Sequence, residues 1–327
     1  MKTKIIAEIA QGYEGDINIT KRFVKLAKLC GADGIKFQIF EAEELCLPNY
    51  KYYDLFKSLY IEPEEWKKII ALCNDIGLEF YADIFGTTTL QWMLDAGISG
   101  IKIHSTDVKN YKLLTLLKDK NIRIILGVGG STLEEIETAI KYLGKNEIIA
   151  MSGFQAEPNL IEDIELNKLS IIKERFKLPV GYADHIDVKT PLSKSLPAMA
   201  VLMGADYIEK HLTIERDFLQ IEDYISALNP NEFIEMVNSI REVENFPDPH
   251  NYQFELTDRE KTYRKNSKKM ILADKDIPEG AIISESDVTM LRSAEEYNEI
   301  LDQSDIIGKK ALRKITKYQA IRKEFLQ

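Results

Sequence analysis

The sequence predicts an α/β protein, a parallel eight-stranded (β/α)8 barrel of the TIM type followed by a small C-terminal domain. Up to about residue 240, eight short apolar runs alternate with segments of helical spacing, and this alternation is typical of a parallel barrel. A stretch with two prolines and no periodicity follows at 244–252,. We therefore predict a barrel domain over 1–245, a linker over 246–265 and a small domain over 266–327.

The barrel strands are expected wherever a short apolar run precedes a segment of helical spacing. Two further short strands are expected in the C-terminal domain, at 269–273 and 288–291, separated by turn residues,. The eight predicted barrel strands lie at about 4–9, 33–39, 78–84, 100–105, 122–128, 147–152, 179–184 and 206–212.

Helical spacing and end signals justify the helices between these strands. After the first strand, Phe23, Ala27 and Cys30 fall on one face together with Ile19 and Leu26, and a glycine supplies the C-terminal stop,. Another helix is expected to begin near 131, because Ser131 and Glu134 have the spacing of a capping box,.

Composition limits the classes of function. Of 327 residues, 45% are apolar and 29% are charged, which is ordinary for a globular protein,. No apolar run approaches the roughly 20 residues of a membrane span, and the first residues do not form a signal peptide. A formal charge of −10 without a basic block argues against a general nucleic-acid binder,. Three cysteines without metal spacing favour a reduced cytosol, so we expect a cytoplasmic protein,.

Functional side chains of a β/α barrel come from the C-terminal ends of its strands and the loops that follow. Lys36 and Gln38 are two residues apart and share a strand face, as do Glu209 and His211, whereas Ser105 must lie beyond its strand end to join them,. The strand-end rule selects Glu8, Lys36, Gln38, Lys102, Ser105, Gln155, His185, Glu209 and His211.

Two lysines inside a barrel would be costly unless an anion met them, so Lys36 and Lys102 point to a carboxylate or phosphate ligand. A glycine-rich turn at 127–130 could add backbone N–H donors at a helix start,. Lysines of this kind can also pair with a nearby glutamate, and we expect Lys210 to point outward and do so.

The histidines at the ends of strands seven and eight, His185 and His211, form a candidate metal pair. Two imidazoles without a cysteine or an obvious third ligand leave positions open for water and substrate. Such a site suits octahedral Mn²⁺ or Mg²⁺ better than a closed zinc site, and the ion could polarise a carbonyl group or activate water. We assign His104 and His250 to core or loop positions.

Together these motifs resemble the sialic acid (N-acetylneuraminate) synthases, and the segment from about 266 resembles their C-terminal antifreeze-like (β-clip) domain. The resemblance spans almost the whole chain. It is carried by Ile-Ala-Glu-Ile-Ala-Gln-Gly-Tyr-Glu-Gly-Asp at 6–16, Gly-Ala-Asp-Gly-Ile-Lys-Phe-Gln at 31–38, Ile-Lys-Ile-His-Ser at 101–105, Ser-Thr-Leu-Glu-Glu-Ile at 131–136, Pro-Val-Gly-Tyr-Ala-Asp-His at 179–185 and Ile-Glu-Lys-His-Leu-Thr at 208–213.

The resemblance implies condensation of phosphoenolpyruvate with an open-chain N-acyl amino sugar, giving a nine-carbon 2-keto-3-deoxy acid and phosphate. It also implies a domain-swapped homodimer in which Arg292 closes the partner's sugar site. With the strand-end rule it gives catalytic roles to Glu8, Lys36, Lys102 and Glu209, a Mn²⁺-type ion to His185 and His211, phosphoenolpyruvate contacts to Lys36, Lys102 and Ser105 with Gln155 at the position of a family asparagine, and sugar contacts to Glu8, Gln38 and Asp223.

The chain departs from the family pattern where hydroxyl groups are expected to bind phosphoenolpyruvate. The family's Ser-Thr-Pro-Phe after strand three corresponds here to part of 81–85, where Ala82 lacks a hydroxyl group. The family's serine before Asp-His is Ala183, and its Ser-Thr-Gly after strand five is Gly127-Val128-Gly129. Two alternatives therefore remain open. One is a metal-assisted sugar isomerase or aldolase, and the other is a non-catalytic carbohydrate-binding protein on the same fold.

Overall fold

The computed structural model describes residues 2–153, 156, 158–216, 222–246, 254–293 and 302–327, with only the backbone of 222 and 223. The chain divides into two compact units, residues 1–247 and 248–327. Each unit is described by itself.

The first unit is a closed barrel of eight parallel strands in sequential order, β1 to β8, and this confirms the predicted fold. Each strand pairs with its neighbours in the chain, and β1 closes the ring against β8. The strands are β1 (Lys4–Ala10), β2 (Gly34–Ile39), β3 (Glu79–Ile84), β4 (Gly100–Ile103), β5 (Arg123–Gly127), β6 (Glu147–Ser152), β7 (Val180–Asp184) and β8 (Tyr207–His211).

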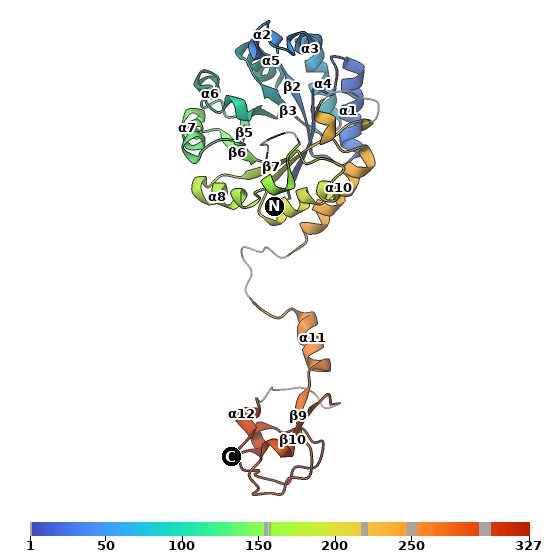
Figure 1. Ribbon diagram of the computed structural model, residues 1–327, viewed down its shortest axis with the longest axis vertical. Helices are drawn as coiled ribbons and strands as arrows, with labels where there is room; N and C mark the ends of the chain where they lie inside the picture. Colours follow the sequence, from blue (N-terminus) through green and yellow to red (C-terminus); the bar gives the residue numbers. More distant parts are fainter. Residues whose placement is uncertain (1, 154–155, 157, 217–221, 247–253, 294–301) are drawn as a thin grey trace. The chain divides into compact units, whose positions relative to one another are not determined.

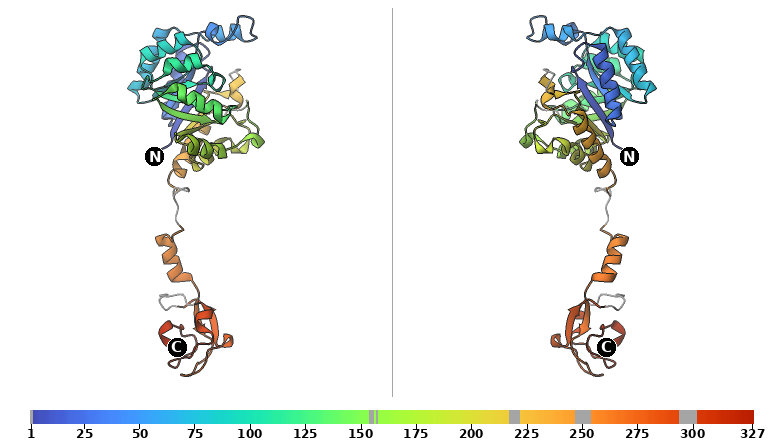
Figure 2. Two further views of the ribbon diagram at one scale, coloured as in Figure 1. Left: turned by 90° about the vertical axis from the view of Figure 1, so that its left-hand side faces the viewer. Right: turned by 90° about the vertical axis from the view of Figure 1, so that its right-hand side faces the viewer.

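Helices surround the strands as an outer ring (Figures 1 and 2). The longer helices of this ring bury the apolar faces that the sequence periodicity predicts. Two short helices, α2 and α3, follow β2 in the chain. The helices are α1 (Ile17–Leu29), α2 (Ala42–Leu45), α3 (Tyr53–Ser58), α4 (Pro63–Asp75), α5 (Thr87–Ala96), α6 (Tyr111–Leu117), α7 (Leu133–Leu143), α8 (Asn167–Phe176), α9 (Leu196–Leu202) and α10 (Pro230–Val243).

The local sequence explains how these helices begin and end. The Asp16 carboxylate accepts hydrogen bonds from the first turn of α1, whose inner face buries Phe23 and Ala27 as expected, and Gly31 ends the helix at φ 85°,. At α7 the capping box consists of Thr132 and Glu135. The prediction from Ser131 was wrong by one residue, because the Ser131 N–H still closes the preceding turn on the carbonyl oxygen of residue 128.

The lower half of the barrel interior is apolar and is built around the ring of Tyr81. Tyr81 is fully buried, and a Cβ atom at Gly34 or Gly100 would lie 2.7 or 2.8 Å from that ring. The two glycines therefore make room for Tyr81, whose hydroxyl donates to Glu79 and accepts from Arg123. The cluster around it consists of Ile6, Tyr81, Ile125, Ile149, Met151, Ala183 and Tyr207.

The second unit has a small core around an antiparallel pair of strands, β9 (Met270–Ala273) and β10 (Val288–Leu291), close to the predicted positions. The short helix α12 (Gln303–Ile306) contributes the buried Ile306. The buried apolar residues of this unit are Ile271, Ala273, Ile277, Ile283, Ile306, Ala311, Ile315, Ile321 and Phe325.

The segment 246–265, expected as a linker without periodicity, contains most of a helix, α11 (Asp258–Ser267). Its N-terminus carries a capping box of Thr257 and Glu260. The helix has no buried residue, so hydrophobic periodicity could not reveal it. Capping and good helix formers stabilise it instead.

Candidate active site

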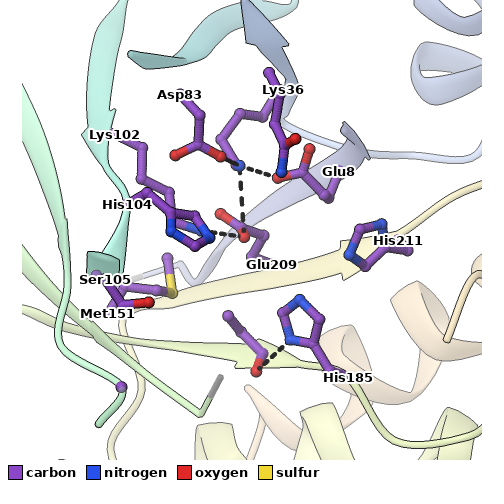
Figure 3. A pocket seen from close by; sticks show the side chains of 14 residues that line it. Glu8, Lys36, Asp83, Lys102, His104, Ser105, Met151, His185, Glu209 and His211 are labelled. Atoms are coloured by element: carbon purple, nitrogen blue, oxygen red, sulfur yellow. Dashed lines mark hydrogen bonds and ion pairs between the residues drawn. The ribbon is translucent and has the colours of Figure 1, made fainter. Parts of the chain in front are cut away.

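Strand register gathers a polar layer at the C-terminal mouth of the barrel, directly above the apolar half. Glu8 on β1 lies opposite both Lys36 on β2 and His211 on β8. On the other side of β2, Asp83 on β3 lies opposite Lys102 on β4. The side chains of all five residues line one pocket (Figure 3).

An irregularity at the end of β1 helps to place Glu8. The register of β1 against β2 shifts between Glu8 and Ala10, and Ala10 adopts a positive φ of 51°. The Ala10 N–H then donates a hydrogen bond of 2.5 Å to the Glu8 carboxylate. A bulge of this kind re-aims a side chain at the end of a strand, and here it accompanies the turn of Glu8 into the pocket.

Both lysines meet carboxylates of the protein itself. The Lys36 ammonium contacts Glu8 and Asp83 directly and lies 3.7 Å from the Glu209 carboxylate, while Lys102 contacts the same Glu209 oxygen (Figure 3). All five side chains are almost completely buried. In this structure, strand-end carboxyl groups of the protein therefore lie beside the lysines, where we expected the anionic groups of a ligand.

This arrangement separates the acidities of the two glutamates. Burial raises the pKa of Glu8 to about 8, although Lys36 acts in the opposite direction,. Burial also disfavours the charged form of Glu209, but Lys102 and Lys36 outweigh it and lower its pKa to about 2. For Lys36 burial opposes the charge, yet Asp83, Glu209 and Glu8 together raise its pKa. Near pH 7 the pocket thus holds a neutral and an ionised glutamate side by side.

His185 and His211 face each other at the edge of the pocket, with ring centroids 5.0 Å apart and planes at 76°. Burial lowers the pKa of His185 to about 3, helped by Lys102, and burial also lowers the pKa of His211 well below its usual range. Neutral imidazoles are the form that binds metal ions. With bonds of about 2.0–2.1 Å from ring nitrogen to metal, rings at this separation can share one ion.

Within the described part of the chain, no group of three or more His, Cys, Asp or Glu side chains is arranged as a ready metal site. An ion on the two histidines would therefore take its remaining ligands from water or substrate. The two imidazoles by themselves would leave positions open for such ligands.

The rest of the pocket comes from strand ends and from the loops after β4 and β5. Ser105, just past the end of β4, lines the pocket together with Gly127. Gln38 on β2 also lines it, and the amide oxygen of Gln38 accepts a hydrogen bond of 2.9 Å from Gln11. A Cβ atom at Gly127 would lie 3.0 Å from the Ser105 backbone nitrogen. The absence of a hydroxyl-bearing side chain at 127 therefore has a steric reason, because a side chain there would crowd the backbone of Ser105.

The glycine-rich turn after β5 offers fewer free donors than expected. The Val128 N–H donates to the Met151 carbonyl oxygen at 2.9 Å, and the Ser131 N–H donates within the turn. The start of α7 is occupied by its own capping box. Gly129 does line the pocket.

The structure does not test the placement of three predicted site residues. Gln155 lies outside the described residues. Asp223 belongs to a short 3-10 helix, Glu222–Ile225, in which its side chain is not described. Arg292 is exposed and directly follows β10 in the second unit. His250 also lies outside the described residues.

Two polar residues of the pocket, Asp83 and His104, were not predicted from the sequence. Asp83 is the penultimate residue of β3 and shares the inward face with Tyr81, so the strand-end rule applied to the other strands would have found it,. His104, assigned to core or loop, follows β4 and lines the pocket, with its ring 5.7 Å from that of Phe85 and its Nδ1 3.0 Å from the Thr106 hydroxyl.

Lys210 differs from its expected setting. It points away from the pocket, as predicted, but it is fully buried and pairs at 2.8 Å with Asp184 rather than with a glutamate. Asp184 precedes His185 and Lys210 precedes His211, and the two lie opposite each other in the register of β7 and β8. The buried ion pair therefore links the backbones that carry the two histidines.

Fold and site together define a β/α-barrel protein whose charged pocket lies where barrel enzymes bind their substrates. The NeuB family model matches residues 23–250, and the SAF domain model matches 268–327. The chain therefore belongs to the NeuB family and carries a SAF, or antifreeze-like, domain at its C-terminus.

Several known proteins resemble the chain over most of its length. The uncharacterized protein MJ1065 of Methanocaldococcus jannaschii is 37% identical over 245 residues, covering 74% of this chain and 71% of that protein. The N,N'-diacetyllegionaminic acid synthase of Legionella pneumophila is 29% identical over 309 residues, covering 88% and 85%. The crystal structure of the N-acetylneuraminic acid (sialic acid) synthetase of Leptospira borgpetersenii, in complex with citrate, has a TM-score of 0.73 at 27% identity, covering 81% and 92%.

The part of the chain described by the structure contains no helix with the length and apolarity needed to span a membrane.

Proposed function

We propose that the protein catalyses a metal-dependent condensation of phosphoenolpyruvate with an open-chain N-acyl amino sugar, giving a sialic-acid-like nonulosonate and phosphate. The observation that carries the proposal is the pocket itself, in which two neutral histidines and two lysines meet at one strand-end mouth. Family membership supports it, as do the names of the relatives from Legionella and Leptospira, which are synthases of legionaminic and sialic acid.

A divalent ion, Mn²⁺ or Mg²⁺, would be held by His185 and His211. The separation of the rings and their neutral state fit such an ion. When bound, the ion would act as a Lewis acid on the sugar carbonyl group.

The protein's own groups would bind and orient the phosphoenolpyruvate. Lys102 and Ser105 line one side of the pocket, and Lys36 lies deeper, among the carboxylates. We assign the phosphate and carboxylate of the donor to these three residues, with Gln155 beside them. An ammonium group in a buried pocket binds an anion more strongly than in water because the local dielectric is low.

The reaction forms a carbon–carbon bond between C3 of phosphoenolpyruvate and the aldehyde carbon, and water then adds at C2 as the bond to phosphate breaks. The protein must hold both substrates in contact and handle the protons of the new hydroxyl groups. Glu8 and Glu209 are suited to this because one is protonated and the other ionised near neutral pH. Catalytic roles are therefore assigned to both glutamates and to Lys36 and Lys102.

The sugar would lie toward the outer part of the pocket. We assign its hydroxyl contacts to Glu8, Gln38 and Asp223. Arg292 of a second subunit would complete the sugar site in a domain-swapped homodimer. The proposed setting is the cytoplasm, supported by three free cysteines, of which Cys30 and Cys73 are buried,.

The test is a coupled assay with Mn²⁺, phosphoenolpyruvate and a panel of N-acetylated hexosamines, measuring phosphate release and loss of phosphoenolpyruvate. At least one sugar should give equal amounts of phosphate and nonulosonate, and both should disappear when a chelator removes the metal. Lys102→Met should abolish both products, whereas the exposed control Lys118→Met should leave them unchanged. Silence with every sugar, in protein shown to bind Mn²⁺ tightly, would contradict the proposal.

One observation favours a second candidate, a metal-assisted sugar isomerase or aldolase that uses no phosphoenolpyruvate. Lys36 and Lys102 already have carboxylate partners in this structure, so the pocket does not require an anionic ligand for its charge balance. This candidate predicts conversion of the sugar in the absence of phosphoenolpyruvate and no release of phosphate, which the same assay measures.

A further inference from the structure

Asp83, near the C-terminal end of β3, places a buried carboxylate in the pocket. Its side chain is 1% exposed, and one carboxylate oxygen, Oδ2, contacts the Lys36 ammonium. Among the described residues, the other oxygen, Oδ1, has no hydrogen-bond partner. Figure 3 shows the carboxylate directed at the lysine inside the pocket. Asp83 therefore depends on Lys36 to offset the cost of its burial.

Lys36 is shared among several anions. Glu8 also contacts its ammonium, and Glu209 lies 3.7 Å away and bonds Lys102 as well. A buried charge is stabilised only by partners close to it, so an incoming anion must compete with the carboxylates that already surround this ammonium. Glu8 also accepts a hydrogen bond from the Ala10 N–H, and Glu209 also contacts the second lysine, Lys102. Among the described residues, Asp83 is therefore the carboxylate of this group whose only close partner is Lys36.

Few hydroxyl donors are available for an anion in this pocket. Ser105 lines it, but residues 127 and 183, which also line it, are Gly and Ala. At 127 the close approach of the Ser105 backbone leaves little space for a side chain. The strength with which the pocket holds an anion therefore depends chiefly on the lysines and on what else they bind.

We propose that Asp83 is an internal counter-ion that competes with the anionic donor substrate for Lys36, and so sets the affinity of the pocket for that donor. The identity of the donor as phosphoenolpyruvate rests on the proposed function. The competition itself applies to any phosphate or carboxylate that reaches Lys36.

The experiment is calorimetric titration of the full-length protein with phosphoenolpyruvate and, separately, with inorganic phosphate, as purified and again after addition of Mn²⁺. Asp83→Asn keeps the shape of the side chain and removes its charge, and Asp83→Thr is a second neutral variant suited to a strand. Removing a charge this close to Lys36 should tighten phosphoenolpyruvate binding about tenfold or more.

The matched control is Glu79→Gln, which removes the same charge from the other end of the same strand. Residue 79 lies four residues from 83, or about 13 Å along a strand, so screening should keep the change in affinity below about twofold. Thermal unfolding of each variant verifies that it is folded.

A double-mutant cycle tests whether Asp83 acts through Lys36. In a Lys36→Met background there is no ammonium left for the carboxylate and the anion to compete for, so adding Asp83→Asn should change anion affinity by less than about threefold. The inference is overturned if folded Asp83→Asn and Asp83→Thr bind both anions no more tightly than the wild type, or if the gain persists without Lys36.

The outcomes separate this inference from the proposed function. Tighter anion binding by Asp83→Asn, without condensation of any sugar by the wild type, would support the role of Asp83 and contradict the synthase. Condensation by the wild type without tighter binding by the variants would do the reverse.

Discussion

Lys36 and His185 illustrate how neighbouring side chains in one pocket can have opposite charge requirements. Asp83 and Glu209 hold the lysine in its charged form, whereas burial keeps the histidine neutral. The strand ends bring acidic groups close to the Lys36 ammonium. They also place the centroids of the two imidazole rings 5.0 Å apart. Single substitutions should therefore affect either the lysine–carboxylate group or the histidine pair without affecting the other.

His185→Ala should abolish tight binding of Mn²⁺, because a single imidazole would remain. Changes outside the first ligand shell alone typically cost roughly 10- to 100-fold in metal affinity, so the loss should be at least about 100-fold. Free Mn²⁺ can be followed by electron paramagnetic resonance during titration. The control is His104→Ala, which removes a pocket histidine packed on Phe85 and should leave the affinity unchanged. Equal binding by His185→Ala and the wild type would exclude the proposed ion site.

Glu8 should make folding stability depend on pH in a direction unusual for a carboxylate. Its pKa is raised from 4.5 to about 8 in the folded state, so its stabilising contribution is complete below about pH 4.5 and is lost as the pH rises through 8. In metal-free protein the wild type should therefore lose stability relative to Glu8→Gln across this range, by no more than about 5 kcal/mol.

Urea denaturation of both proteins at several pH values measures this difference. The comparison cancels the contributions of His185 and Glu209, which titrate in both proteins. A difference in unfolding free energy that stays constant between pH 4.5 and 8 would show that Glu8 is ionised throughout.

At the scale of elements, the ends of β7 and β8 are joined by the Asp184–Lys210 pair, which is fully buried. Lys210→Met should lower the free energy of unfolding by about 3–5 kcal/mol, because it leaves a buried carboxylate without its cation. The double variant with Asp184→Asn should recover most of this loss. Urea denaturation measures the effect, and no loss in the single variant would mean that the pair does not stabilise the fold.

The same pair gives a second measurement for the histidines. If it fixes the two strand ends, Lys210→Met should also weaken Mn²⁺ binding by roughly tenfold. The surface pair of Lys194 and Glu235 provides the control, since Lys194→Met removes a cation from an exposed ion pair and should change neither quantity measurably,.

The sequence predicted the barrel because every strand is a short apolar run, and the strand-end rule then named Glu8, Lys36, Lys102, Glu209 and both histidines, which the structure places in one pocket. The pairing of the lysines could not be predicted in the same way. It depends on contacts across the barrel interior between strands that are not neighbours, such as that of Lys102 on β4 with Glu209 on β8. The helix α11 escaped prediction for a local reason, since it buries no residue.

At the scale of the whole molecule, the proposed sugar site needs two subunits. If Arg292 acts on the partner's barrel, a mixture of Arg292→Ala and His185→Ala chains should regain activity that neither variant has alone. Random pairing would give one intact site in half of the dimers, or about a quarter of the wild-type activity. Co-expression with two affinity tags allows the mixed dimer to be isolated and assayed. Inactive mixed dimers would contradict a shared site.

The tyrosine wedged between two glycines in the lower barrel has a consequence for substrate traffic. Its ring and the surrounding isoleucines, Ile6, Ile125 and Ile149, plug the channel beneath the charged layer. Within the described residues, small molecules can therefore come and go only through the upper opening. A product formed next to the Lys36 ammonium would have to leave through the same opening by which the next donor enters. Product release must therefore precede binding of the next donor.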